Sequence, residues 1–125
     1  MKEYMLFIRK ENDHNAELSP EQHIAFLKGC EAYIGKLIKE GKLKSAQPIE
    51  RQGKIISGSK GVFKESPFNE SKEVIGGYYH ILAKDFDEAI AIAKANPEFE
   101  YHANTRIEVR PIKMQEETTG FVYPK

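Results

Sequence analysis

Two segments of this chain, residues 4–8 and 74–83, carry apolar side chains on both faces of an extended strand. Residues 4–8 are five apolar residues in a row between charged neighbours, which is typical of a strand buried on both faces. Residues 74–83 are rich in β-branched and aromatic residues, which favour strands. Both segments therefore predict central strands of a sheet that needs cover on each side.

The first predicted helix begins after Ser19 and ends before Gly41. Ser19 can cap the free amide groups, Pro20 suits the first helical position and Gln22 completes a capping box. Apolar residues then recur at helical spacing in one stripe, at Leu27, Cys30, Ile34, Leu37 and Ile38. Gly41 is the residue type that most often follows a helix end, so the pattern predicts an amphipathic helix of about five turns.

The second predicted helix begins after Asp85, with Glu88 three positions later as in a capping box. Its apolar face consists of Ala89, Ile90, Ile92 and Ala93, and Pro97 is expected to stop it. Strands are expected at residues 43–49 and 106–110, and a hairpin at residues 54–64. Residues 65–73 are expected to form a polar loop. The pair Gly76–Gly77 predicts a bulge or a close backbone approach.

Without the hairpin, the order of elements is β-α-β-β-α-β, the split pattern of ferredoxin-like folds. The sequence therefore predicts an α+β domain over residues 1–113, a β-α-β-(hairpin)-β-α-β chain with an antiparallel sheet and both helices on one face. Residues 114–125 are expected to form a polar, loosely held C-terminal tail.

The sheet face opposite the helices is expected to pack against a second copy of the chain. Strict alternation places Ile75, Tyr79 and Ile81 on one face of the long strand, and Val74, Tyr78, His80 and Leu82 on the other. Both sets are largely apolar. Because an apolar face of this size should not remain in water, the sequence predicts a homodimer packed sheet to sheet.

The charge balance argues against nucleic acid as a partner. The chain has 125 residues, of which 19 are basic and 19 acidic, and it lacks the basic clusters that displace counterions from phosphates. The single cysteine, Cys30, excludes an internal disulfide and fits a reducing compartment. The apolar run near the N-terminus is too short to span a membrane. We therefore expect a cytoplasmic protein with neither nucleic-acid nor membrane partners.

The segment that follows the hairpin resembles the YCII-related family. Residues 65–68, 70–73 and 76–78 read Glu-Ser-Pro-Phe, Glu-Ser-Lys-Glu and Gly-Gly-Tyr. They are similar to the Asp-Gly-Pro-Phe, Glu-x-Lys-Glu and Gly-Gly-Tyr/Phe motifs of one branch, and the similarity covers roughly residues 1–113. The resemblance implies a dimeric α+β barrel, with a cavity between the sheet, the loop near Pro67 and the partner subunit. It also implies chemistry that often needs no metal or organic cofactor.

Two departures from the family pattern bear on catalysis. Ser66 replaces the glycine of the Asp-Gly motif, which reshapes the turn if that glycine has a positive φ. Some members carry a His/Asp pair on the first helix and before its terminal Glu-Gly. Cys30 and Lys39 occupy these positions here, while His23 lies earlier in the helix, so the pair is not carried over.

His80 and Glu65 are the candidate catalytic residues. His80 lies beside Tyr78 on the predicted inter-sheet face, where a histidine could exchange protons near neutral pH or simply pack and hydrogen-bond. Glu65 could act as a base if Pro67 and Phe68 shield it from water, or it is a solvated loop carboxylate.

Four residues are candidates for substrate binding: Tyr78, Phe68, Lys72 and Arg110. Arg110 could hold a carboxylate with two hydrogen bonds or pair with Glu108 instead. Lys72 could orient an anion or belong to a solvated charged loop. The histidines show no spacing typical of metal ligands, so we expect no metal site and no cofactor.

These residues leave two functions open. The first is a cofactor-independent enzyme, or a binder of a small organic molecule in a barrel cavity, with His80 and Glu65 as acid and base. The alternative is a non-catalytic dimeric module that binds a ligand or a protein. The sequence decides neither whether the protein is an enzyme nor what its substrate is.

Overall fold

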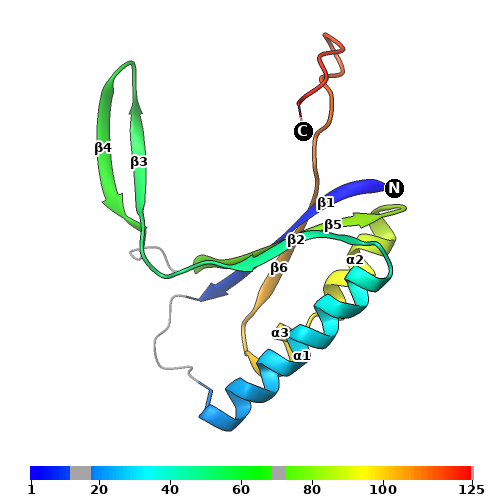
Figure 1. Cartoon of the computed structure of the whole chain (residues 1–125). Helices are drawn as coiled ribbons and strands as arrows, with labels where there is room; N and C mark the ends of the chain where they lie inside the picture. The colour runs from blue at the N-terminus through cyan, green and yellow to red at the C-terminus, as the bar shows by residue number, and fades with distance from the viewer. Residues whose placement is uncertain (12–17, 69–72, 125) are drawn as a thin grey trace.

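A computed structural model describes residues 1–11, 18–68 and 73–124 and shows an α+β fold (Figure 1). The elements are, in chain order, β1 (Lys2–Glu11), α1 (Pro20–Lys39), β2 (Leu43–Pro48), β3 (Lys54–Ser59), β4 (Val62–Pro67), β5 (Glu73–Ala83), α2 (Phe86–Lys94), α3 (Glu98–Tyr101) and β6 (Arg106–Pro111). This is the predicted order with one additional short helix, α3.

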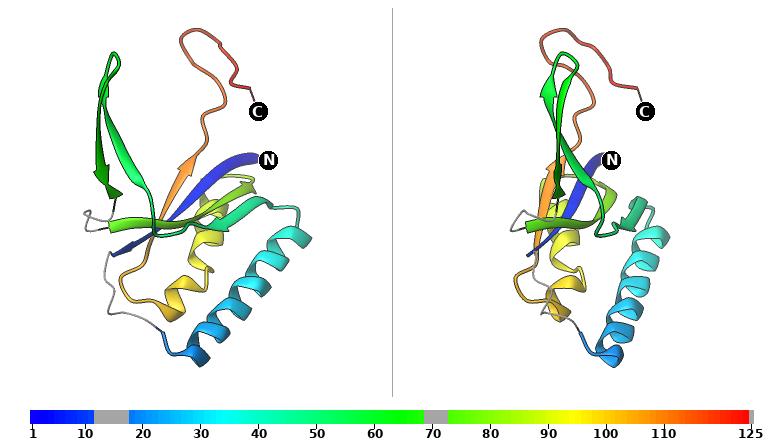
Figure 2. Two further views of the ribbon diagram at one scale, coloured as in Figure 1. Left: turned by 60° about the vertical axis from the view of Figure 1, so that its left-hand side comes forward. Right: turned by 90° about the vertical axis from the view of Figure 1, so that its left-hand side faces the viewer.

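Four strands form one antiparallel sheet in the order β2-β5-β1-β6. The helices lie on one side of this sheet, which confirms the predicted ferredoxin-like layout (Figures 1 and 2). The core lies between the sheet and the helices, where Leu6, Ile81, Ala83 and Ala89 have no exposed surface. The two central strands, β1 and β5, are the two segments that the sequence predicts to be covered most fully.

The predicted start and end of α1 are confirmed. The Ser19 side chain accepts a hydrogen bond from the Gln22 amide at 3.2 Å, and the Gln22 side chain accepts one from the Ser19 amide at 3.1 Å. Beyond the helix, Gly41 has a φ of 70°, a conformation that costs glycine no steric strain. Local hydrogen bonds thus define both ends of this helix.

The second helix ends earlier than expected. Asp85 caps α2 through a 2.9 Å hydrogen bond from the Glu88 amide, as predicted, but the helix ends at Lys94. Pro97 lies two residues beyond the C-cap residue Ala95, a usual position for a proline that follows a helix. It also precedes α3, where its missing amide proton leaves no donor unsatisfied. The Asn96 side chain accepts a 2.9 Å hydrogen bond from the Glu98 amide and holds this turn.

A β-bulge in β5 corrects the predicted faces of this strand. Ile8 pairs with Gly77 and Arg9 pairs with Ile75, so Gly76 is an extra residue that shifts the alternation of side chains. As a result Val74 is buried at 7% exposure, on the helical face, whereas Ile75 is 49% exposed on the opposite face. The prediction was wrong for both residues because it assumed an uninterrupted strand.

The glycine pair has the predicted close approach as well. A Cβ atom on Gly77 would lie 3.0 Å from the carbonyl oxygen of Gln47 in β2, and one on Gly76 would lie 3.2 Å from the Lys10 side chain. Both glycines therefore allow the neighbouring strands to approach β5 at the bulge.

Strands β3 and β4 form a separate two-stranded sheet, which we call the arm. The predicted loop began too early, because β4 continues to Pro67 and pairs it with Lys54. The C-terminal tail also contains a small hairpin, with a bridge between Gln115 and Val122. The arm and this hairpin both project from the side of the main sheet that is opposite the helices (Figure 2).

Candidate functional site

The sheet face opposite the helices, which we call the open face, brings together three strands. Directly paired residues of antiparallel strands share a face, so the strand registers place these side chains there. The set comprises Glu3, Met5, Phe7 and Arg9 from β1, Ile75, Tyr78, His80 and Leu82 from β5, and Arg106, Glu108 and Arg110 from β6. Apolar residues occupy the middle of this face, and charged residues lie at both ends.

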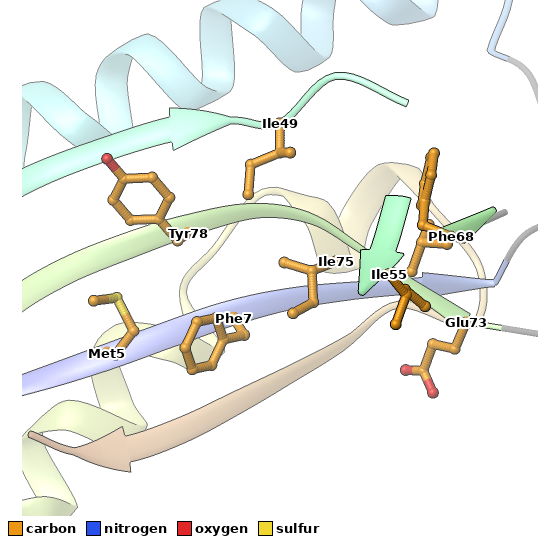
Figure 3. A pocket seen from close by; sticks show the side chains of 9 residues that line it. Met5, Phe7, Ile49, Ile55, Phe68, Glu73, Ile75 and Tyr78 are labelled. Atoms are coloured by element: carbon orange, nitrogen blue, oxygen red, sulfur yellow. The ribbon is translucent and has the colours of Figure 1, made fainter. Parts of the chain in front are cut away.

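A cavity of about 540 Å³ lies over the apolar middle of the open face (Figure 3). Its lining comprises Met5, Phe7, Ile49, Ile55, Phe68, Glu73, Val74, Ile75 and Tyr78. Within the described residues, the lining is apolar apart from Glu73 and the hydroxyl group of Tyr78. Because Ile55 belongs to β3, the arm forms part of the wall. The volume is in the range of small-molecule sites.

A histidine–carboxylate pair lies next to this cavity. The His80 Nε2 atom is 2.8 Å from the Glu3 Oε1 atom, and the Lys44 Nζ atom lies 3.2 Å from the same oxygen. The Glu3 side chain is 7% exposed and that of His80 is 22% exposed. His80 is paired across the strands with Met5, which lines the cavity. A carboxylate that accepts a hydrogen bond from Nε2 favours the tautomer with its proton on Nε2, in which the Nδ1 atom can accept a proton.

The other end of the open face holds an ionic cluster. Arg9 lies between two carboxylates, with its Nη1 atom 3.0 Å from Glu108 Oε1 and its Nε atom 3.2 Å from Glu73 Oε1. Arg106 also pairs with Glu73 through its Nη2 atom. This cluster joins the ends of β1, β5 and β6, and because two arginines balance two glutamates it brings no large net charge to the cavity.

The structure brings some of the predicted site residues together. Tyr78 and Phe68 line the cavity, and His80 adjoins it. Arg110 lies on the same face, with a side chain that is 67% exposed and an Nε atom 3.8 Å from Glu108 Oε2. Lys72 lies outside the described residues.

Glu65 is placed apart from His80. It belongs to the arm, its side chain is 60% exposed, and its Oε1 atom lies 3.0 Å from Lys54 Nζ. It is not among the described residues that line the cavity. The described residues of this chain therefore do not supply the shielding from water that would make Glu65 a base.

The sequence did not point to Glu3, the partner of the histidine, or to Lys44, which contacts the same carboxylate. The available signal was the alternation of β1, which puts Glu3 on the same face as Met5 and Phe7. No sequence pattern indicated its proximity to His80, which is 77 residues away in the chain.

A second group of ionisable residues lies on the helical side of the sheet. The Glu98 carboxylate is 3.3 Å from Lys10 Nζ and 3.0 Å from His102 Nδ1, and its side chain is 9% exposed. Burial lowers the pKa of His102 below its ordinary value, against the opposite effect of Glu98. Burial, followed by the charge of Glu98, raises the pKa of the Cys30 thiol, and burial raises that of Tyr79 to about 12.

Among the residues that the structure describes, no group of three His, Cys, Asp or Glu side chains is placed to hold a metal ion. In the same parts of the chain, no helix is long and apolar enough to cross a membrane.

A family model for the YCII-related domain matches residues 3–113. The chain belongs to the YCII-related family. No curated protein matches this YCII-related chain in sequence. Among solved structures, it is similar to the 5-chloro-2-hydroxyhydroquinone dehydrochlorinase (TftG) from Burkholderia phenoliruptrix AC1100, solved in complex with 2,5-dihydroxybenzoquinone. The two share 16% sequence identity over 84% of this chain and 90% of that chain, with a TM-score of 0.45.

Proposed function

We propose that this YCII-related protein binds a small organic molecule in the cavity on its open face, and that His80 exchanges a proton with that molecule. The observation that carries the proposal is the His80–Glu3 pair, with its 2.8 Å contact, beside a mainly apolar cavity of about 540 Å³. An apolar cavity with a few polar groups at its edge is the usual form of a small-molecule site.

The ligand we expect is compact, mostly apolar and possesses one acidic group. Phe7, Ile75 and Tyr78 offer flat or branched apolar surfaces to its body (Figure 3). Arg110 lies on the same face across from Met5 and could hold a carboxylate with two parallel hydrogen bonds. The Tyr78 hydroxyl group could orient a carbonyl or phenol oxygen.

Proton transfer at this site needs only side chains of the protein itself. Glu3 accepts the Nε2 proton of His80, which leaves the Nδ1 lone pair to take a proton from the ligand. The buried carboxylate then stabilises the imidazolium that forms, so no metal or organic cofactor is required for this step. In this proposal Glu65 takes part only if a partner covers the arm and shields it from water.

The cavity is proposed to be completed by a second copy of the chain. Met5, Phe7 and Tyr78 remain half-buried on the open face, and the arm exposes Ile56 and Phe63 at 67% and 70%. A two-stranded hairpin has little stability alone, so the arm is expected to gain cover in a homodimer.

The alternative function is a non-catalytic dimeric module that binds a ligand or a protein. The exposed apolar side chains of the arm favour it, because such surfaces often mark sites of protein association. In this case the His80–Glu3 pair would hold β1 to β5 and would take no part in chemistry.

Solvent exchange detects proton transfer to or from a ligand whatever reaction follows it. We would incubate the protein in D₂O with a panel of small carboxylic and keto acids and follow deuterium incorporation at carbon by proton NMR. Exchange that is lost in His80→Gln and reduced in Glu3→Gln supports the proposal. His23→Gln, on the other side of the sheet, is the matched control.

Binding without exchange in any panel member would instead support the non-catalytic module. It would be detected as ligand-dependent shifts of the His80 side-chain resonances. Sedimentation of the wild-type protein tests the homodimer separately. A monomer at micromolar concentration would contradict the proposed completion of the cavity.

A further inference from the structure

We propose that a groove between α1 and the helical face of the sheet is a second binding site, for an elongated, mainly apolar molecule with one uncharged polar group. A long-chain alcohol is the simplest member of this class. The groove lies mainly on the helical side of the sheet, and Ile49, Phe68, Val74 and Ile75 line both the groove and the cavity of the proposed function. The inference does not depend on that function, because α1 lines only the groove.

The groove arises because α1 packs loosely on the sheet. In α1, all of whose residues are described, only Phe26 and Leu37 are buried. Leu27 and Ile38 belong to the apolar stripe of the helix, yet they are 50% and 61% exposed. The apolar stripe of α1, which the sequence predicts to pack in the core, therefore forms one wall of a cavity of about 880 Å³.

The shape and lining favour an elongated apolar ligand. The lining extends along α1 from His23 to Ile38, which corresponds to about 22 Å of helix. Across from the helix, the sheet contributes Ile8, Ala46, Val74 and Tyr79. A ligand lying along this groove would cover apolar surface from both walls at once.

One end of the groove carries an ion pair of balanced charge, and the charged residues Glu31, Glu50 and Arg51 also contribute to the lining. Lys10 and Glu98 both line it, 3.3 Å apart, and His102 contacts the other oxygen of the Glu98 carboxylate at 3.0 Å. This end lies against Phe26, whose ring centroid is 4.8 Å from that of His102. Cys30 also lines the groove, and burial keeps its thiol protonated by raising its pKa.

This balance selects an uncharged polar group on the ligand. The positive charge of Lys10 is already compensated by the nearly buried carboxylate of Glu98. A charged head group would therefore bring a second, unpaired charge into a poorly solvated place. A hydroxyl group, in contrast, could donate to Glu98 and accept from Lys10 without changing the charge of the site.

Gly35 provides a way to fill the groove. It lies on α1 and lines the groove, and a Cβ atom built on it would meet no atom within 4 Å. Gly35→Leu would place a large side chain in this space. Gly35→Ala is the matched control, because it changes the helix propensity in the same direction but leaves most of the space free.

The experiment uses the fluorescent probe N-phenyl-1-naphthylamine, an uncharged aromatic amine, with the full chain. We expect saturable binding to the wild type, a loss of affinity of at least about tenfold in Gly35→Leu, and little change in Gly35→Ala. Dodecanol should displace the probe at concentrations about tenfold lower than dodecanoate or dodecylammonium. Thermal melts establish that each variant is folded. Binding retained in Phe7→Ala separates this site from the open-face cavity, because Phe7 lines that cavity and not the groove.

Four results would overturn the inference. The first is the lack of saturable probe binding to the wild type, and the second is unchanged affinity in folded Gly35→Leu. The third is equal displacement by the charged and uncharged competitors. In the fourth, the wild type binds no probe but self-associates, and Gly35→Leu abolishes the association, which would make the groove a surface for a second copy.

Discussion

The Lys10–Glu98–His102 cluster predicts a loss of stability that depends on pH. Lys10→Met keeps the aliphatic length of the side chain but removes the charge that lies 3.3 Å from the Glu98 carboxylate. Removal of one partner from a fully buried ion pair costs about 3–5 kcal/mol of unfolding free energy. Lys10 is 30% exposed and His102 remains beside Glu98, so we expect a smaller loss of about 1–2 kcal/mol near pH 8.

The sign of the pH dependence follows from His102. Its pKa in the folded protein is lowered, so as the pH falls below about 6.5 the unfolded chain binds the proton first and the wild type loses stability. Lys10 contributes to the lowered pKa. Without Lys10, the imidazolium forms more readily in the folded state and pairs with Glu98. The deficit of the variant should therefore shrink as the pH falls.

Urea denaturation of both proteins between about pH 5.5 and pH 8 measures this deficit. Lys28→Met is the control, because Lys28 is an exposed lysine of α1 and its loss should change the unfolding free energy by less than about 0.5 kcal/mol. A deficit for Lys10→Met below about 0.5 kcal/mol at pH 8 would refute the reasoning. So would a deficit of equal size at both ends of the pH range.

Three further predictions concern single residues. Gly35→Ala should raise the unfolding free energy, measured by urea denaturation, by about 0.5–1 kcal/mol. Alanine loses less backbone entropy in a helix than glycine, and its Cβ atom would meet no neighbouring atom within 4 Å. A loss of stability would contradict this. Gly77→Ala should lower the melting temperature, since its Cβ would lie 3.0 Å from the Gln47 oxygen, and an unchanged melting temperature would mean that β2 moves freely. Burial raises the pKa of Tyr79 to about 12 and also raises that of Tyr33. The unfolded chain therefore loses these protons first, and the unfolding free energy should fall as the pH rises from about 10 through 12. Absorbance at 295 nm should then show tyrosines that ionise only on unfolding, and ionisation of all tyrosines in the folded protein at about pH 10.5 would disprove it.

The helices and strands could be predicted because local chemistry defines them. Ser19 and Gln22 cap α1 within one turn, and Asp85 caps α2 in the same way. The apolar runs of β1 and β5 predict the two central strands of the sheet. The order of helices and strands along the chain predicts the ferredoxin-like layout. Each of these features depends on residues a few positions apart, so a single sequence contains the needed information.

The candidate sites could be predicted only in part. The alternation of β5 predicts His80 and Tyr78 on the open face correctly, because both residues follow the bulge. The partner of His80 is Glu3, from the other end of the domain, and the cluster on the helical side joins Lys10 to Glu98. Such contacts depend on strand register and helix packing, which no local pattern specifies.

The sequence alone therefore determined which segments are helices and strands, which layout they form and which family they belong to. The tertiary structure decided the rest. The extra residue at Gly76 reversed the faces of Val74 and Ile75, the arm separated Glu65 from His80, and the loose packing of α1 opened a groove. The physical reason is distance along the chain. Caps and periodicity act within one or two turns, whereas bulges, ion pairs and cavities depend on how distant segments fit against one another.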